Sequence, residues 1–461
     1  MDTFKAEVES ILRKQKMFFE SGMTRDIKFR LNALTKLAKT IKKYEQDIYK
    51  ALYKDLRKSE FESLASEISG VMDEISYIRK RLRKWARPRR CAVHINNKPA
   101  SGKLYPEPYG SVLIFSAWNY PFNLCMTPFV GALAAGNCVV VKPADQAPAT
   151  AEIIIKILSE CFDPEHVVAV HGGSDHASCL LEHKFDYIFF TGGENYGRKV
   201  MRAAAEHLTP LTLELGGKSP CIIEPDVKLK VAAKRIVWGK FLNAGQTCVA
   251  PDYLFVHESV KKPLLDEMKK VIKAFYGDDP QQSPDYPRII NSRHFERLKQ
   301  LIEARECFCG GVTDLDDLYI APTIVDNVLR DDILMQNEIF GPILPVVTWR
   351  NFDEVIDFVN SRPKPLAMYY FSDKCKDLDR LLSRTSAGGM CVNETVTHLI
   401  NPAMPFGGVG NSGMGGYHGK FSFDTFTHTK PILNKFTFID LPLRYAPYAR
   451  KLKFLRFICK Y

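Results

Sequence analysis

The sequence has no hydrophobic run long enough to cross a bilayer, no paired Cys-x-x-Cys units and no internal repeat. A membrane-spanning helix needs about 20 mostly apolar residues, so no transmembrane segment is expected. The twelve cysteines are scattered, with only Cys307 and Cys309 close together, and the histidines form no cluster typical of a metal site. Because the chain also starts without a secretory segment, we expect reduced cysteines, a cytoplasmic location and no bound metal.

The charge is positive but not concentrated in one place. The chain carries 64 basic and 53 acidic residues, a net charge of +11. The two signs are interspersed, mostly on helical stretches, which favours a solvated surface or steering of an anionic ligand over a nucleic-acid partner. With 46% hydrophobic and 25% charged residues, the composition is ordinary for a soluble protein with a large core.

The last residues, Leu443–Tyr461, are basic and amphipathic. A helix of this kind can contact a membrane surface. Packing of Phe454, Leu455 and Ile458 against the body or a partner subunit is the favoured interpretation, and peripheral membrane contact is the alternative.

The first part of the chain, residues 1–87, is predicted to be helical. Apolar residues recur there at three- and four-residue steps and form one buried stripe: Phe29, Leu34, Leu37, Ile41, Tyr44 and Ile48. Residues 91–106 are short and irregular with proline and glycine, which indicates an arm or a hairpin.

From residue 110 the pattern changes to strands alternating with helices. Four short β-branched or aromatic runs each precede a helical stretch: Ser111–Phe115, Cys138–Val141, His166–Val170 and Tyr187–Phe190. Such alternation predicts a parallel, doubly wound sheet covered on both faces. Residues 212–393 repeat it, which indicates a second α/β lobe. The glycine-rich run 405–416 is predicted to be a loop.

Two residues carry the chemistry that is expected of this chain. Cys248 lies in Phe241-Leu-Asn-Ala-Gly-Gln-Thr-Cys-Val-Ala-Pro-Asp-Tyr253, and Glu214 lies in Leu213-Glu-Leu-Gly-Gly-Lys-Ser-Pro220. Covalent aldehyde oxidation needs a thiol that adds to the carbonyl and a separate base that activates water to release the thioester. A cysteine taken alone is usually buried and inert, so the surrounding runs matter.

Both runs resemble the two motifs of the aldehyde dehydrogenase superfamily, and the resemblance extends from about residue 8 to residue 430. Three further runs resemble its class 3 branch: 248–253, 285–295 and 411–420. The resemblance implies an α/β fold with a Rossmann-like cofactor domain, a second α/β catalytic domain and a small oligomerisation arm. We expect residues 1–90 and 107–211 to form the cofactor domain and 212–393 the catalytic domain. Residues 91–106 and 394–461 would form the bridging arm and C-terminal tail of a homodimer.

The candidate phosphate loop is Phe190-Thr-Gly-Gly-Glu-Asn-Tyr-Gly-Arg198, which follows a predicted strand and opens a helix. Backbone N–H groups at a helix N-terminus can bind a pyrophosphate. The loop lacks the G-x-G-x-x-G spacing, so spacing alone fits an ordinary strand–helix turn equally well. The resemblance implies that Gly192, Gly193 and Gly197 contact the phosphates. Gly193 stands where the family commonly has serine, so a side-chain contact is expected to be missing.

Two more residues are expected at the adenosine end of the cofactor. Lys142 ends a strand, where open α/β sheets bind ligands, and the resemblance implies that it reaches the ribose. Asp145 stands where the family often has glutamate. A carboxylate there binds the 2′-hydroxyl of NAD and repels the 2′-phosphate of NADP. Because aspartate is one methylene shorter, both effects should be weaker, and we expect use of NAD or NADP.

Four other residues are expected near the aldehyde and the nicotinamide. Asn119 lies in Ser116-Ala-Trp-Asn-Tyr-Pro121. An asparagine that follows a strand usually belongs to a turn, but the resemblance implies that the Asn119 amide and the Cys248 N–H form an oxyanion hole. Trp118 would line the path of the aldehyde. Glu338 would bind the nicotinamide ribose, and Phe340 would pack near the ring. Asn393 also matches a family position, and a structural role is favoured for it.

The predicted reaction is NAD(P)-dependent oxidation of medium-chain aliphatic or aromatic aldehydes to carboxylates. A CoA-acylating dehydrogenase is an alternative that would not need Glu214 as a water base. A Cys/His hydrolase would need an orienting histidine, for which the resemblance provides none. A catalytically silent relative is the third alternative.

Overall fold

A computed structural model describes residues 2–440 and 442–459. The chain divides into two compact units, Met1–Trp85 with Pro108–His428, and Ala86–Glu107 with Thr429–Tyr461. Among the described residues, no helix is both long enough and apolar enough to cross a membrane.

The helical N-terminal region is confirmed. Its helices are α1 (Asp2–Glu20), α2 (Ile27–Lys43), α3 (Glu45–Leu56), α4 (Glu60–Ser63) and α5 (Ser69–Trp85), with a π-helical turn at Leu64–Ile68. The predicted stripe is fully buried at Leu34, Leu37, Ile41 and Ile48. It is not one helix, because α2 ends before Tyr44 and α3 begins after it.

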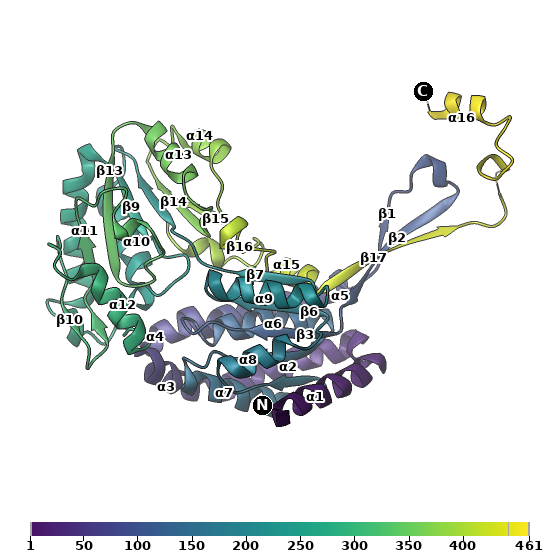
Figure 1. The fold of residues 1–461 in the computed structure, drawn as a ribbon, viewed down its shortest axis with the longest axis horizontal. Helices are drawn as coiled ribbons and strands as arrows, with labels where there is room; N and C mark the ends of the chain where they lie inside the picture. Colours follow the sequence, from purple (N-terminus) through teal and green to yellow (C-terminus); the bar gives the residue numbers. More distant parts are fainter. Residues whose placement is uncertain (1, 441, 460–461) are drawn as a thin grey trace. The chain divides into compact units, whose positions relative to one another are not determined.

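The first sheet has six strands in the order β16-β7-β6-β3-β4-β5 (Figure 1). The strands are β3 (Ser111–Phe115), β4 (Cys138–Lys142), β5 (Val167–Ala169), β6 (Tyr187–Thr191), β7 (Leu211–Glu214) and β16 (Gly413–Met414). The connecting helices are α6 (Asn123–Ala135), α7 (Pro148–Cys161), α8 (Ser174–Leu181) and α9 (Glu194–Glu206). All neighbours are parallel except β16 and β7. The doubly wound sheet is therefore confirmed.

The strand order reverses between β3 and β6. The chain runs from β3 outward through β4 to β5 and then returns to β6, which pairs with β3. Right-handed crossovers place the helices of the two halves on opposite faces of the sheet. One face is covered by α1, α8 and α9, through a core that includes Leu113, Phe115 and Phe190. A ligand crevice is expected where the carboxyl ends of β3 and β6 diverge.

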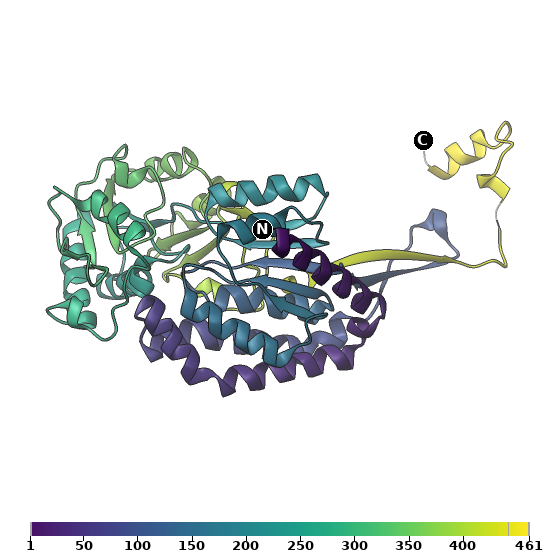
Figure 2. The ribbon, with the colours of Figure 1, turned by 60° about the horizontal axis from the view of Figure 1, so that its bottom comes forward.

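The second sheet is entirely parallel, with the order β12-β13-β9-β8-β14-β15. Its strands are β8 (Pro220–Ile223), β9 (Tyr253–His257), β12 (Thr323–Val325), β13 (Ile343–Trp349), β14 (Ala367–Phe371) and β15 (Gly389–Val392). Its helices are α10 (Leu229–Phe241), α11 (Lys261–Tyr276), α12 (Ser292–Ile302), α13 (Phe352–Asn360) and α14 (Leu378–Arg384). The short strands β10 (Thr313–Asp314) and β11 (Tyr319–Ile320) form a separate pair. Figures 1 and 2 show this second α/β lobe beside the first.

The sequence predicted that the glycine-rich run 405–416 is a loop, but part of this run forms a strand. Gly413 and Met414 form β16, in which Gly413 pairs with Glu214 of β7. Gly413 has a φ of 142°, and a Cβ there would lie 2.1 Å from the Leu213 carbonyl oxygen. Glycine therefore permits the close backbone pairing of β16 with β7, which no local sequence pattern predicts. Helix α15 (Gly419–Thr425) follows.

The second unit contains an antiparallel hairpin. Strand β1 (Arg89–Cys91) pairs with β2 (Ala100–Pro108), and β2 pairs with β17 (Thr427–Lys435). The predicted arm or hairpin at 91–106 is thus a hairpin. The tail contains α16 (Leu452–Cys459), where Phe454 and Leu455 are 56% and 47% exposed in the single chain. The packing predicted for Ile458 concerns a side chain outside the described part.

Candidate active site

Cys248 follows an unusual turn at the end of α10. Asn243, Ala244 and Gly245 have successive φ values of 53°, 51° and 71°, in the left-handed region. A Cβ on Gly245 would lie 2.3 Å from the Gly341 carbonyl oxygen, so a side chain is excluded there. Strained backbone of this kind persists only where the surroundings impose it, and it is common at functional sites. The turn delivers Cys248 to the N-terminal side of β9.

The Cys248 thiol is surrounded by low-polarity protein and by carboxyl groups. Burial, together with smaller contributions from the nearby Glu338 and Glu214 carboxyl groups, raises the pKa of Cys248 to about 12. Without a ligand, the thiol is therefore protonated at neutral pH. These interactions also show that Glu214 and Glu338, which come from separate segments, both lie near Cys248.

Glu214 ends β7 as a buried carboxyl group. The residue is 3% exposed, and neither carboxyl oxygen has a hydrogen-bond partner among the described residues. Burial raises the pKa of Glu214 well above its ordinary value. Buried carboxyl oxygens are rarely left unpaired, so this group is prepared for a molecule outside the chain, such as water.

Asn119 comes after β3 and reaches the cysteine segment directly. Its side-chain Nδ2 donates a hydrogen bond to the Gln246 carbonyl at 3.0 Å. The neighbouring Tyr120 hydroxyl lies 2.7 Å from the Thr247 hydroxyl. Two contacts thus join the segment that carries Asn119 to the segment that precedes Cys248.

A buried charged network behind Asn119 was missed by sequence reasoning. Lys58 and Glu67 form a fully buried ion pair at 2.5 Å. The Lys58 ammonium also donates to the Asn119 carbonyl at 2.9 Å, and the Asn243 side chain donates to the same oxygen at 2.7 Å. Glu67 accepts from the N–H groups of Phe122 and Asn123, at 3.1 and 2.9 Å. No motif contains Lys58, which lies between α3 and α4, or Glu67, which lies in the π-helical turn, so the sequence did not predict their pairing.

The phosphate-loop candidate forms the predicted strand–turn–helix. Gly193 is the N-cap of α9 and provides no side-chain cap, and a Cβ on Gly193 would meet nothing within 4 Å. The Thr191 hydroxyl is buried and has no hydrogen-bond partner in the described part of the chain. Glu194 turns to Arg198, with 2.5 Å between their charged atoms. Uncapped helix N–H groups, an orphaned hydroxyl and open space above Gly193 fit a bound pyrophosphate.

The adenosine-side candidates lie at the carboxyl end of β4. Lys142 is buried, its ammonium donates to the Pro143 carbonyl at 3.0 Å, and burial lowers its pKa. Asp145 is exposed, and a Cβ on Gly173 would lie 3.5 Å from its carboxyl oxygen. An exposed carboxylate beside a glycine loop is suited to a ribose hydroxyl.

Glu338 lies on the glycine pair that follows Glu214. A Cβ on Gly216 would lie 2.0 Å from a Glu338 carboxyl oxygen, so the close approach requires glycine. Burial raises the pKa of Glu338 to about 8. Phe340 has a φ of 51° and meets Trp118 edge to face, with 5.3 Å between ring centroids. Phe340 and Trp118 therefore pack against each other, and Glu338 lies near the Cys248 thiol.

Cys391 and His398 form a thiol–imidazole pair that is not among the predicted catalytic residues. Cys391 Sγ lies 3.2 Å from His398 Nδ1. Burial raises the pKa of Cys391 and lowers the pKa of His398 to about 4, so both stay neutral. A neutral pair is not an activated nucleophile. Nearby Asn393 bonds the Ser372 backbone through both side-chain ends, which supports the structural role predicted for it.

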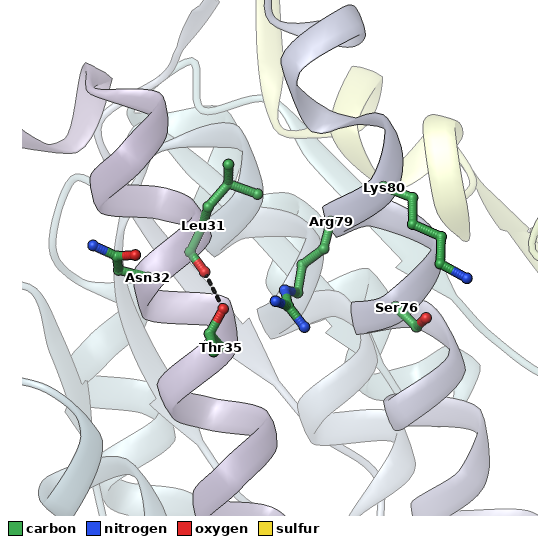
Figure 3. Close-up of a pocket in the computed structure, with 6 residues that line it drawn as sticks. All are labelled: Leu31, Asn32, Thr35, Ser76, Arg79 and Lys80. Carbon is green, nitrogen blue, oxygen red and sulfur yellow. Dashed lines mark hydrogen bonds between the residues drawn. The ribbon is translucent and has the colours of Figure 1, made fainter.

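Two surface grooves contain none of the candidate residues. The first, with a volume of about 430 Å³, lies between α2 and α5 and is lined by Leu31, Asn32, Thr35, Ser76, Arg79 and Lys80 (Figure 3). The second runs along α11 and includes Cys309 and Tyr319. In the part of the chain that the structure describes, no group of histidine, cysteine and acidic residues could hold a metal ion.

Comparison with known proteins agrees with this geometry. The profile of the Aldehyde dehydrogenase family matches residues 2–432. The chain is 46% identical to the 4,4'-diaponeurosporen-aldehyde dehydrogenase of Staphylococcus aureus, over 97% of this chain and 98% of the relative. It is 45% identical to the mouse (Mus musculus) aldehyde dehydrogenase named dimeric NADP-preferring, over 93% and 94%. It is 44% identical to aldehyde dehydrogenase family 3 member A2 of Pongo abelii, over 93% and 88%.

A solved structure agrees as closely as the sequences do. The substrate-bound state of Staphylococcus aureus AldH superposes with a TM-score of 0.96 at 45% identity, covering 98% of this chain and 99% of that one. The family match spans more than half of the chain, and the relatives are matched along nearly their whole length. The chain therefore belongs to the aldehyde dehydrogenase family, in its class 3 branch, and is an enzyme of that kind.

Proposed function

We propose that this enzyme oxidises apolar aldehydes to carboxylates with NAD or NADP, through a covalent intermediate on Cys248. The observation that carries the proposal is Glu214, a buried carboxyl group that has no hydrogen-bond partner within residues 2–440 and 442–459 and whose charge acts on the Cys248 thiol. A nucleophile beside a separate, unengaged carboxyl group is the pair required to form a thioester and hydrolyse it.

The first half of the cycle takes place at Cys248 and Asn119. The Cys248 thiol first loses its proton to solvent. The thiolate then forms a bond to the carbonyl carbon, and the carbonyl oxygen becomes an alkoxide. The Asn119 amide and the Cys248 N–H stabilise that charge, with Asn119 exchanging its bond to the Gln246 carbonyl for one to the alkoxide. As the alkoxide collapses, the carbon loses a hydride and remains attached to sulfur as a thioester. The bound nicotinamide supplies the hydride acceptor.

The second half of the cycle depends on Glu214. After losing its own proton, Glu214 takes one from water, and the hydroxide adds to the thioester carbon. The C–S bond then breaks, which returns Cys248 as a thiolate and releases the carboxylic acid, whose proton passes to solvent to give the carboxylate product. The raised pKa of Glu214 makes it a stronger base than an exposed glutamate once it is ionised.

The cofactor would be bound by Gly192, Gly193 and Gly197 at the phosphates, by Lys142 and Asp145 at the adenosine ribose, and by Glu338 and Phe340 at the nicotinamide end. Use of NADP as well as NAD is supported by the short Asp145 carboxylate and by the mouse relative, which is named NADP-preferring. Trp118 and Phe340 give the site an apolar wall. We infer medium-chain aliphatic or aromatic aldehydes as substrates, and the name of the Staphylococcus relative supports adding a long polyene aldehyde to the panel.

A homodimer joined by the second unit is the assembly we propose. The hairpin of β1 and β2 and the exposed tail are the natural arms for exchange between subunits, and one relative is named dimeric. We infer a cofactor domain of residues 1–90 and 107–211 and a catalytic domain of 212–393, in a cytoplasmic protein with reduced cysteines. Sedimentation equilibrium, with and without residues 441–461, tests the assembly.

The function is tested by the absorbance of reduced nicotinamide with short, medium, long, aromatic and polyene aldehydes, using NAD and NADP separately. Activity without CoA that is lost in Cys248→Ala would support the hydrolytic dehydrogenase. Activity only with CoA would transfer the assignment to the acylating type. Silence under both conditions would indicate a silent relative and overturn the proposal.

A further inference from the structure

Lys218 and Asp252 form a buried ion pair in the catalytic lobe. The Lys218 ammonium lies 2.5 Å from an Asp252 carboxyl oxygen, and the two side chains are only 8% and 4% exposed. A buried ion pair contributes little net stability, because desolvation offsets the attraction. Its placement therefore calls for another explanation.

The pair holds the peptide groups on both sides of Glu338. The Lys218 ammonium donates to the carbonyl of Asn337 at 3.0 Å. The second Asp252 carboxyl oxygen accepts from the N–H of Ile339 at 3.0 Å. The residue before Glu338 is thus bound by the cation, and the residue after it by the anion.

The same pair joins the segments that carry the proposed catalytic groups. Lys218 lies four residues after Glu214, and Asp252 lies four residues after Cys248. The two segments then enter the paired strands β8 and β9, and the Asp252 N–H donates to the Ser219 carbonyl at 2.8 Å. Because the carboxyl group of Glu338 rests on Gly216, the pair fixes that carboxyl group relative to both segments.

We propose that Lys218 and Asp252 are positioning residues that hold Glu338 in place and thereby set the affinity for the nicotinamide-ribose half of the cofactor. The proposal rests on the proposed function, because it takes Glu338 as a ligand of that ribose. Neither Lys218 nor Asp252 touches the cofactor; each acts through the backbone of residues 337 to 339.

The binding of two ligands, NADH and ADP, distinguishes this positioning role from a general structural role. NADH reaches both halves of the cofactor site, whereas ADP occupies only the adenosine half. In Lys218→Met, the dissociation constant of NADH rises about tenfold or more, because displacement of a binding group by about 1 Å is costly, while that of ADP stays unchanged. Lys261→Met, which breaks the partly buried Lys261–Asp326 pair of the same lobe, is the matched control and leaves both constants unchanged.

A double variant tests whether Lys218 acts through Glu338. Lys218→Met combined with Glu338→Gln should bind NADH within about twofold of Glu338→Gln alone, since coupled residues are non-additive. If Lys218→Met does not fold, Asp252→Asn replaces it, because the asparagine keeps an oxygen for the Ile339 N–H and loses only the ion pair. Calorimetric titration measures each constant.

Three results would overturn the proposal: equal weakening of NADH and ADP, unchanged NADH binding in a folded variant, or additive effects in the double variant. Failure of the unaltered chain to bind NADH at all would instead overturn the proposed function. The two failures are therefore distinguishable.

Discussion

The side-chain amide of Asn119 donates to the main-chain carbonyl of Gln246 at 3.0 Å, two residues before Cys248. This bond joins the segment that follows β3 in the first sheet to the segment that precedes β9 in the second. The two lobes of unit 1 therefore meet at the residues that the proposed chemistry requires.

Asn119→Ala should lower kcat by about 10²–10³-fold, because one oxyanion-hole donor is lost. The steady-state rate with a saturating aldehyde and cofactor measures the effect. Asn393→Ala is the amide control, since Asn393 bonds the Ser372 backbone and should affect stability more than kcat. Equal losses of kcat in both variants would refute the role of Asn119.

Cys248→Ala should abolish aldehyde oxidation, because the covalent intermediate of the proposed mechanism forms on the Cys248 thiol. Cys391→Ala is the matched control, since it removes the thiol of the neutral pair with His398. It should retain most of the activity. Loss of activity in Cys391→Ala with activity kept in Cys248→Ala would assign the nucleophile to the other pair and revive the Cys/His alternative.

The alkylation of Cys248 by iodoacetamide should depend steeply on pH in the ligand-free enzyme. With a pKa raised to about 12 by burial, the thiolate fraction increases tenfold per pH unit, so the rate should rise without a plateau up to about pH 10. Glu338 adds negative charge near the sulfur. Glu338→Gln should therefore lower the thiol pKa and speed alkylation at about pH 9, several-fold. A plateau near the ordinary thiol pKa would contradict the burial argument.

The Lys58–Glu67 pair should be costly to break. Glu67→Gln leaves the Lys58 ammonium buried and unpaired, which should destabilise the protein by about 3–5 kcal/mol, seen as a lower urea midpoint. Lys43→Met breaks the exposed Lys43–Glu160 pair and should cause no measurable change. Because Lys58 also holds the Asn119 carbonyl, Glu67→Gln should lower kcat in the fraction that stays folded. An unchanged kcat would show that the network supports folding alone.

Much of this site was predictable from short runs of sequence. The strand Ser111–Phe115 and the turn at Thr191–Gly193 have local signatures, since β-branched runs followed by turn residues are typical of parallel sheets. Cys248, Glu214 and Asn119 lie in motifs, and the structure brings their segments together.

The remainder depends on partners far away in the sequence. Nothing near Lys58 indicates that it will pair with Glu67 and bind the Asn119 carbonyl, because both look like surface charges on amphipathic helices. Strand β16 forms because Gly413 and Met414 pair with Glu214 and Leu213 of β7. Its own two residues do not favour a strand, so the local sequence does not predict it. The left-handed Ala244 is imposed by packing, because alanine does not favour that conformation.

Glu62 should make stability depend on pH within a defined window. The residue is buried and accepts the Asn243 N–H at 2.9 Å, and burial raises its pKa to about 7 from an ordinary 4.5. Because the folded state keeps the proton to a higher pH than the unfolded state, this group favours folding most below about pH 4.5 and loses that contribution as pH rises to about 7. Glu62→Gln, whose amide oxygen can still accept from Asn243, should therefore raise the melting temperature at pH 8 relative to the unaltered chain and change it little at pH 5. Thermal unfolding followed at both pH values checks this difference. A variant that is destabilised more at pH 8 than at pH 5 would mean that the Glu62 carboxylate is favourably paired with Lys58 in the folded state, with its pKa lowered rather than raised.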